Sequence, residues 1–177
     1  MRVLLHTERL SIRSVAANDW KRVMDIWEDF RCSPYAEYDG IPTNDEATVR
    51  SKVRQWEQVT SGKEHMFYAV CLEEIMIGYV DFHRTDRGYE CGYCFHSDYH
   101  GRGYAKESMQ ALMRFLANEA DMEFTAGTAL ENRPSVKLLY SLGFEKIGEE
   151  RVTFYKDEQG KDIYFDGGIF RYIQKRK

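Results

Sequence analysis

The segment from 90 to 106 has residue types and spacing that suit the binding of a phosphate group. It reads Glu-Cys-Gly-Tyr-Cys-Phe-His-Ser-Asp-Tyr-His-Gly-Arg-Gly-Tyr-Ala-Lys, so an expected strand runs into a glycine-containing turn and a helix begins at once. Gly101 and Gly103 let the backbone approach a ligand closely. The free N–H groups of the helix start, with the positive end of the helix dipole, then attract a pyrophosphate. Arg102 and Lys106 add positive charge at the same point. The alternative is an ordinary tight turn between a strand and a helix.

Two common phosphate-binding motifs do not fit this turn. The nucleoside-triphosphate loop requires a Lys-Ser or Lys-Thr pair and a wider glycine spacing, which this sequence lacks. The dinucleotide fingerprint requires a third small residue where Lys106 stands, and it opens a parallel βαβ array. A nicotinamide dinucleotide site is therefore disfavoured.

Hydrophobic periodicity predicts the elements that would hold the turn in place. The expected strands are 7–14, 65–73, 75–84, 89–96, 124–130 and two more within 144–174, around a turn at 157–160. The expected helices start after Asn18 as N-cap, at a capping box of Thr43 and Glu46, near Tyr104 and at Pro134, with Gly143 closing the last one. The order β-αα-βββ-α-β-α-ββ predicts an α+β fold with a mostly antiparallel sheet.

Composition restricts the class of protein further. The 177 residues include 25 basic and 29 acidic side chains, with 43% hydrophobic residues. These values predict one domain, 1–177, with a sizeable core, and they disfavour a nucleic-acid partner. The longest apolar run, 67–72, is far below the roughly 20 residues of a membrane-spanning helix, so no membrane partner is expected. Four cysteines predict no disulfide scaffold and favour a cytoplasmic location.

Cys91 and Cys94 have the spacing of a redox or zinc pair. On a strand, residues three apart face opposite sides of the sheet, so the two sulfurs should diverge. The sequence has no second cysteine pair with ligand spacing. Structural cysteines without a metal are therefore expected.

Four segments together resemble the GNAT superfamily of acetyl-CoA-dependent N-acetyltransferases. Residues 100–105, His-Gly-Arg-Gly-Tyr-Ala, resemble its Gln/Arg-x-x-Gly-x-Gly/Ala signature, with His in the first place. This segment continues to 108, and 103–108 resemble the Gly-Tyr-Ala-Thr-Glu-Ala helix start of the branch with the ribosomal-protein N-terminal acetyltransferases. The other three segments are 7–13, which resembles that branch's opening strand, 90–93, which resembles its Glu-x-Gly-Tyr strand, and 132–144, which is similar to its last cofactor-contacting segment. They follow the family order over residues 7–144.

The resemblance implies a fold and an activity. The fold would be a three-layer one, with a central sheet of about seven strands, helices on both faces, and a splay between the fourth and fifth strands that admits the pantetheine arm. The activity would be transfer of an acetyl group from acetyl-CoA to a primary amine, either a small molecule or a protein N-terminus. The alternative is a catalytically silent acyl-CoA-binding module. Homodimers are frequent in this superfamily, so a homodimer is among the expected assemblies.

The resemblance also implies which residues bind the cosubstrate. They are Tyr93, Cys94 and Phe95 along the pantetheine arm, His100, Gly101, Arg102, Gly103, Tyr104, Ala105 and Lys106 at the pyrophosphate, and Asn132 and Ser135 at the start of the last helix. For Ser135 the alternative is a local helix cap.

Glu90 is the candidate general base. Its side chain projects from the expected strand near the splay, where it could accept a proton from the amine through a water molecule. The alternative is a carboxylate that only stabilises the sheet, in which case the base would come from 35–39 or Asp81. Loop 32–43 could recognise a cationic amine or simply be solvated.

Tyr140 is the candidate general acid for the leaving thiolate. Many superfamily members place a tyrosine seven residues after the asparagine, and that position holds Leu139 here. One residue turns a helical side chain by about 100°, so Tyr140 does not simply inherit the role. The alternatives are a packed aromatic at 140 and protonation of the thiolate by solvent.

Overall fold

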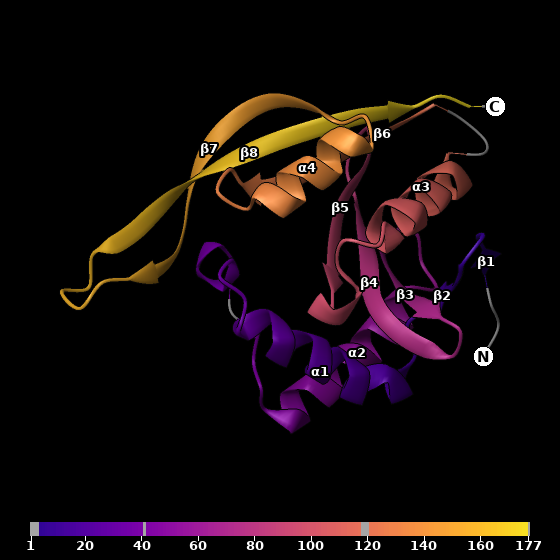
Figure 1. Cartoon of the computed structure of the whole chain (residues 1–177), viewed down its shortest axis with the longest axis horizontal. Helices are drawn as coiled ribbons and strands as arrows, with labels where there is room; N and C mark the ends of the chain where they lie inside the picture. The colour runs from indigo at the N-terminus through magenta and orange to yellow at the C-terminus, as the bar shows by residue number, and fades with distance from the viewer. Residues whose placement is uncertain (1–3, 41, 118–120, 177) are drawn as a thin grey trace.

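An eight-stranded sheet forms the centre of the molecule (Figure 1). The computed structural model describes residues 4–40, 42–117 and 121–176. In sheet order the strands are β1 (Leu5–His6), β2 (Leu10–Ser14), β3 (His65–Leu72), β4 (Ile75–Arg84), β5 (Gly88–Phe95), β6 (Met122–Ala129), β8 (Asp162–Gln174) and β7 (Glu145–Lys156). The predicted α+β class and mostly antiparallel sheet are confirmed.

The extra strand comes from a turn that the sequence pattern did not predict. The expected strand 7–14 is wrong at its start, because residues 7–9 turn and only Leu10 begins β2. The Thr7 N–H donates to the Leu10 carbonyl at 2.9 Å, which folds β1 back onto β2. The physical cause is a long-range contact, since Thr7 and Arg9 are both hydrogen-bonded to Glu107.

The ladder between β5 and β6 is short and parallel. It pairs 88–90 with 123–125, whereas β5 continues to Phe95 and β6 to Ala129. The two strands approach so closely at Gly88 that a Cβ there would lie 1.8 Å from the Glu123 carbonyl oxygen. Beyond this short ladder the two strands are not paired. They correspond to the expected strands 89–96 and 124–130, so the predicted splay between them is confirmed.

Helices cover both faces of the sheet. On one face α1 (Trp20–Arg31) and α2 (Glu46–Val59) pack on β3 and β4, and on the other α3 (Tyr104–Leu116) and α4 (Arg133–Ser141) pack on β2 and β6. Short 3-10 turns lie at Ala17–Asp19, Ala36–Tyr38 and Ser97–Tyr99. None of the four helices, as far as the chain is described, is long and apolar enough to cross a membrane.

Two helix caps differ from the prediction. The N-cap of α1 is Asp19 rather than Asn18, and its carboxylate binds the Ala16 N–H and Arg13, both outside the helix. The N-cap of α2 is Asp45, whose carboxylate accepts from the Thr48 N–H at 2.8 Å. Thr43 instead accepts from the Asp45 N–H, so it precedes the cap. Asp45 therefore caps α2 through its side chain, whereas α1 begins after Asp19 because the 3-10 turn Ala17–Asp19 precedes it directly.

Separate hydrophobic clusters fill the two sides of the sheet. The larger lies under α3 and α4 and includes Phe82, Phe124, Leu139 and Phe170, all fully buried. The smaller lies under α1 and α2, where the rings of Trp56 and Phe67 stack and other neighbours join them. Side chains of β4 and β5 alternate between the two clusters, which fixes the face that each residue presents.

The hairpin of β7 and β8 extends beyond the body of the molecule (Figure 1). Its turn lies at 157–160, as predicted, with Gly160 at φ 79°. Along the arm, the Tyr155 hydroxyl donates to the carbonyls of Ala36 and Asp39, and the Tyr38 ring meets Phe165 edge-on. The hairpin therefore contacts the loop that follows α1.

Candidate functional site

The loop between β5 and α3 presents backbone donors at a helix N-terminus. Gly101 and Gly103 have φ of 72° and 82°, a left-handed conformation that favours glycine. Gly103 is the N-cap of α3, and no side-chain hydrogen bond caps this helix within the described chain. The amides of the first helical turn have no acceptor inside a helix, so those at 104–106 can bind an anion.

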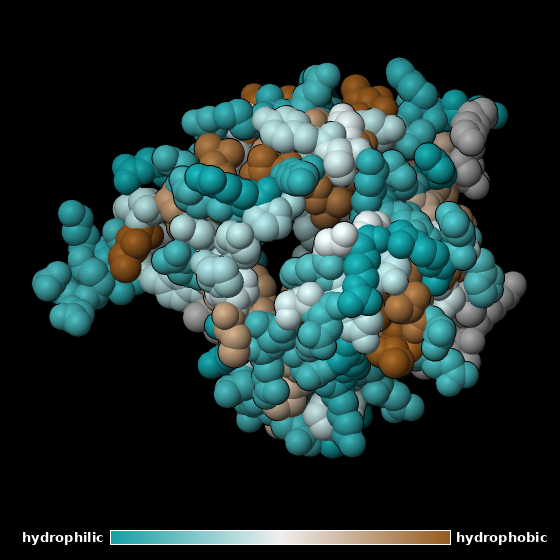
Figure 2. Space-filling model, in the orientation of Figure 1, coloured by the Kyte–Doolittle hydropathy of each residue, from teal (hydrophilic) through white to brown (hydrophobic). Residues whose placement is uncertain are grey.

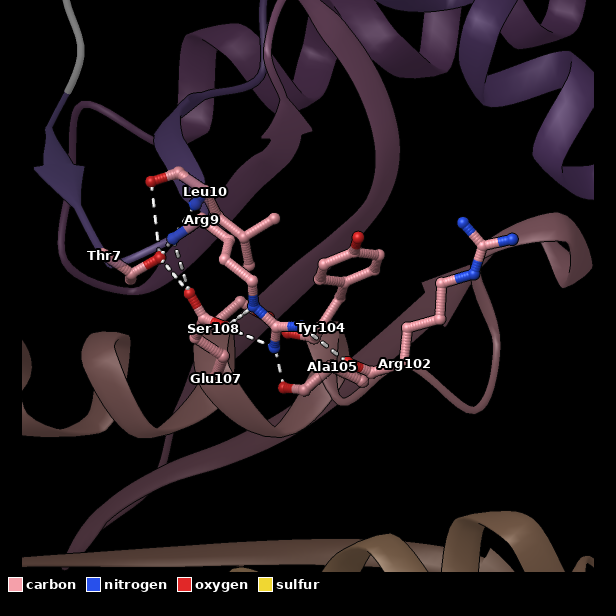
Figure 3. A network of polar contacts seen from close by, with 8 residues as sticks. All are labelled: Thr7, Arg9, Leu10, Arg102, Tyr104, Ala105, Glu107 and Ser108. Carbon is pink, nitrogen blue, oxygen red and sulfur yellow. Dashed lines mark hydrogen bonds and ion pairs between the residues drawn. The ribbon is translucent and has the colours of Figure 1, made fainter.

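A network of side chains holds this loop from the β1–β2 turn (Figure 3). Glu107, one turn into α3, accepts hydrogen bonds from the Thr7 hydroxyl at 2.5 Å and from the Arg9 side chain at 2.8 Å. Arg9 Nη1 also donates to the Arg102 carbonyl at 2.9 Å. The conformation of the loop is thus tied to a turn that lies about 95 residues earlier in the chain.

The basic side chains of the loop have different surroundings. His100 Nε2 lies 2.8 Å from the Phe95 carbonyl, and because a carbonyl only accepts, this nitrogen carries the hydrogen. The Arg102 side chain points away from Arg9 and Glu107 (Figure 3). Lys106 lines a groove of about 550 Å³ between the β1–β2 turn and α3. Because β2 and β5 are separated by two strands, that groove is distinct from the splay.

A hydrogen bond connects β5 with α4 across the splay. The hydroxyls of Tyr93 and Ser135 are 2.7 Å apart, and burial raises the pKa of Tyr93. Asn132 is the N-cap of α4, where its Oδ1 accepts from the Ser135 N–H at 3.3 Å. Three of the expected cosubstrate residues therefore meet at one point, and Asn132 also stabilises the helix start.

The strand residues after Glu90 alternate between the two faces. Cys91 and Phe95 belong to the core under α3 and α4, and Cys94 packs against the core under α1 and α2. The sulfurs diverge as predicted, and all four cysteines are free thiols. Burial raises the pKa of Cys94 to about 12, with added effects from the carboxylates of Asp39, Asp29 and Asp81.

Glu90 lies in a transverse row of polar residues. It pairs with His83 on β4 and with Thr125 on β6, and His83 pairs in turn with His65 on β3. Directly opposed residues share a face, and this one is the face of α1 and α2. Glu90 is exposed and is the last residue of β5 in the ladder with β6. It is therefore positioned where the splay opens.

His83 is the histidine of this row with a carboxylate partner. Its Nε2 lies 3.0 Å from Asp81 Oδ1, and its Nδ1 lies 2.9 Å from His65 Nδ1. The hydrogen bond with Asp81 outweighs burial and raises the pKa of His83, and the charges of Asp81 and Glu90 add to this effect. The cluster can therefore hold a positive charge beside Glu90.

A hollow opens between the surface over α1 and the surface over α4 and the hairpin (Figure 2). Asp29 of α1 accepts from the Ser97 N–H at 2.7 Å and from its hydroxyl at 2.6 Å, which ties α1 to the end of β5. Burial opposes these bonds, which prevail and lower the pKa of Asp29. Tyr79, whose hydroxyl accepts from Trp27 Nε1 at 2.9 Å, lies next to Cys94.

The side chains of Leu139 and Tyr140 in α4 point in different directions, as the rotation per residue of a helix predicts. Leu139 is fully buried in the core, whereas 53% of Tyr140 is exposed. The Tyr140 ring meets Phe170 edge-on, with 5.6 Å between the centroids. Position 139 therefore packs in the core and has no hydroxyl to act as the general acid, and the Tyr140 hydroxyl lies in a different direction.

Sequence reasoning missed the partners of the expected site residues. Arg9 and Glu107 lie within 7–13 and 103–108, two of the segments that resemble the family. Their contact depends on a turn at 7–9, which the alternation of apolar and polar residues over 7–14 does not reveal. The pairing of His83 with Glu90 depends on the register of β4 and β5. A hairpin register counted outward from the turn between these strands could have found it.

Comparison with known proteins identifies related chains. The family model described as an acetyltransferase (GNAT) domain matches residues 9–145. The uncharacterized N-acetyltransferase YnaD of Bacillus subtilis (strain 168) is 26% identical over 164 residues, which cover 90% of this chain and 92% of the relative. The SPbeta prophage-derived uncharacterized N-acetyltransferase YokL of the same organism is 30% identical over 127 residues, 68% of each chain.

Solved structures share the fold. An acetyl transferase from Salmonella typhimurium, described as modifying the N-terminal serine of the ribosomal protein L7/L12, has a TM-score of 0.84 at 17% identity over 98% of this chain and 99% of that one. The ribosomal L7/L12 acetyltransferase RimL in complex with coenzyme A has a TM-score of 0.79 at 15% identity, covering 97% and 98%.

Proposed function

The chain belongs to the GNAT acetyltransferase family, and on this premise we propose that it acetylates a cationic primary amine that enters the hollow beside α1, with Glu90 as the general base. Acetyl-CoA is the cosubstrate of this family. When bound, it supplies an activated acetyl thioester and a thiolate leaving group. The other steps depend on residues of this chain.

The proposed cosubstrate site runs from the β5–α3 loop into the splay. Amides at 104–106 would bind the pyrophosphate, because they are free and lie at the positive end of α3. The unpaired edge of β5 at 93–95 would hydrogen-bond the pantetheine arm. Asn132 and Ser135, which meet Tyr93 on the far side, would flank it. His100 would act by holding the loop against Phe95.

Glu90 would remove the proton from the acceptor amine. The amine must be neutral to attack, and a carboxylate at the mouth of the splay can take its proton through one water molecule. Glu90 is exposed on the face from which α1 and the hollow are reached. The leaving thiolate would then be protonated by Tyr140 or by solvent.

The acceptor is proposed to carry positive charge because three carboxylates lie near Cys94, at the end of β5. Asp29, Asp39 and Asp81 all act on the thiol of Cys94, so the three lie close to the end of β5. An ammonium group would be attracted to this region before it is deprotonated. The observation that supports the assignment most is that the β5–β6 ladder ends at Glu90, while β5 continues to Phe95 with that edge unpaired and leads into the start of α3.

The test is turnover of acetyl-CoA with a panel of amines, read by thiol release. Glu90→Gln should lower turnover by about 10²–10⁴-fold and leave acetyl-CoA affinity nearly unchanged. The deficit should shrink as pH rises, because more of the amine is then neutral in solution. Glu74→Gln, at an exposed turn residue, is the matched control and should retain full activity.

Two results would change the assignment. Near-normal turnover by Glu90→Gln at neutral pH would make Glu90 a structural carboxylate and direct attention to 35–39 or Asp81. Tight binding of coenzyme A without turnover of any amine would indicate a silent acyl-CoA-binding module.

A further inference from the structure

The guanidinium of Arg9 contacts the β5–α3 loop and the start of α3 at three different places (Figure 3). Nη1 donates to the Arg102 carbonyl at 2.9 Å, and Nε and Nη2 lie 2.8 and 2.6 Å from Glu107 Oε2. The guanidinium carbon also lies 4.6 Å from the centroid of the Tyr104 ring. One side chain from the β1–β2 turn thus touches the loop before, at and after the start of α3.

The backbone of the same turn completes the contact. The Arg9 N–H donates to Glu107 Oε1 at 3.0 Å, and the Thr7 hydroxyl donates to the same oxygen. Both carboxylate oxygens of Glu107 are therefore used by residues 7–9. We call Thr7, Arg9 and Glu107 with the Arg102 carbonyl the loop clamp.

The charge of Glu107 explains why an arginine suits this place. A carboxylate in the first turn of a helix interacts favourably with the helix dipole, but it would repel a pyrophosphate bound at the amides of the same turn. Burial of Glu107 is outweighed by the hydrogen bonds from Thr7 and Arg9, which lower the pKa of Glu107, so the carboxylate stays ionised. Arg9 neutralises that charge while fixing the helix start.

The geometry points to Arg9 as a positioning residue for the cosubstrate: we propose that the loop clamp holds 101–104 in the one conformation that turns the amides of α3 outward, and that it shields the pyrophosphate from Glu107. This inference rests on the proposed cosubstrate site. It assigns a binding role to a residue that does not touch the reacting atoms.

A role in cosubstrate affinity is separable from a role in folding. Arg9 lies at a surface turn, and 41% of its side chain is exposed, so its removal leaves both hydrophobic clusters intact. The loop itself contains two glycines with positive φ, whose freedom in other conformations must be restricted by outside contacts. Nη2 of Arg9 lies 3.4 Å from the position of a Cβ on Gly103, so the clamp passes directly beside the N-cap.

The experiment compares two acetyl donors on the intact protein. Acetyl-CoA contains the pyrophosphate, whereas S-acetylpantetheine lacks it. Arg9→Ala should raise the Kd of coenzyme A by about 10-fold and raise the KM of acetyl-CoA, with kcat at saturation and the KM of S-acetylpantetheine unchanged. Arg9→Lys keeps the charge but not the planar fork, so it should recover only part of the affinity.

Two controls separate shielding from general electrostatics. Arg114→Ala removes one positive charge from the same groove at the far end of α3, and it should leave the Kd of coenzyme A unchanged. In the background of Glu107→Gln, Arg9→Ala should raise the Kd by a smaller factor, because the repulsive charge is already gone. A double-mutant cycle over the two residues measures this difference.

Three results would overturn the inference. A Kd of coenzyme A unchanged in Arg9→Ala would show that the clamp does not act on binding. Equal rises in KM for acetyl-CoA and for S-acetylpantetheine would show a general loss of structure instead. If the wild-type protein binds coenzyme A no better than pantetheine, the loop does not bind the pyrophosphate, and the proposed cosubstrate site fails together with the clamp.

Discussion

Replacing Gly103 by valine perturbs the point on which cosubstrate binding is expected to depend. Gly103 has a φ of 82°, which a β-branched residue adopts only with strain, and its N–H and carbonyl frame the start of α3. A side chain there would also meet Arg9 Nη2, which lies 3.4 Å from the ideal Cβ position. We therefore expect 101–106 to leave its conformation and the first-turn amides to turn away from the pyrophosphate.

The magnitude follows from ligand linkage. A ligand at 100 times its Kd stabilises the native state by about 2.7 kcal/mol. For a chain of this length that corresponds to a rise in Tm of about 5–10 °C. If Gly103→Val weakens binding about 100-fold, the same coenzyme A concentration equals the new Kd and contributes only about 0.4 kcal/mol. The strained backbone costs about 1–2 kcal/mol by itself, so the unliganded Tm should also fall by a few degrees.

The assay is thermal unfolding with and without coenzyme A, and Gly160→Val is the matched control. Gly160, in the turn of the β7–β8 hairpin, has a similar φ of 79°, and a Cβ there meets nothing within 4 Å. Both variants should lose similar unliganded stability, and Gly103→Val should lose more of the ligand-induced rise in Tm. Undiminished stabilisation of Gly103→Val by coenzyme A would mean that the loop has been misassigned.

Three further substitutions have defined outcomes. Asn132→Ala removes the cap on the Ser135 N–H and should cost about 1 kcal/mol as well as weaken acetyl-CoA binding; an unchanged Kd with a lower Tm would leave only the cap role. Asp81→Asn should lower the pKa of His83 in an NMR titration, because their hydrogen bond raises it. The stabilisation from this pair is complete below the unfolded pKa of histidine, about 6.5, and is lost as pH rises through the folded pKa of His83. The difference in unfolding free energy between wild type and Asp81→Asn should therefore shrink at alkaline pH. A difference independent of pH would refute the coupling. Tyr140→Phe should lower kcat if the hydroxyl protonates the thiolate, and an unchanged kcat would leave that step to solvent.

The sequence predicted the parts of the site that are local in the chain. A strand, a glycine turn and a helix start follow one another over 90–106, so alternation and capping rules locate them without knowledge of the rest. The splay was predicted only through the family resemblance, since no local pattern shows that a ladder stops after Glu90. Pro134 and Gly143 marked the ends of α4 correctly because their backbone preferences are intrinsic.

The errors have two physical causes. At the starts of α1 and α2, a carboxylate occupies the N-cap position and bonds to residues close in the chain, Asp19 to Arg13 and Asp45 to Thr48. The short β1 was missed because Glu107, about 100 residues away, holds residues 7–9 in a turn. The row from His65 through His83 and Glu90 to Thr125 required the register of four strands at once. Interactions with residues far apart in the sequence decide β1 and the full row, and no single-sequence periodicity contains them.

The three-residue ladder between β5 and β6 has a mechanical consequence. It is the only set of strand pairs between β1–β5 and β6–β8 in the described chain, so the sheet consists of two half-sheets joined by one short seam. Packing of Phe82 against Phe124 and the Tyr93–Ser135 bond add support, but most of the opening lacks a ladder. A force applied across the strands should rupture this seam before the long ladders of β3 with β4 or β7 with β8. A ligand bound between β5 and β6 would contact both half-sheets, so it should raise the rupture force and slow hydrogen exchange at 88–90.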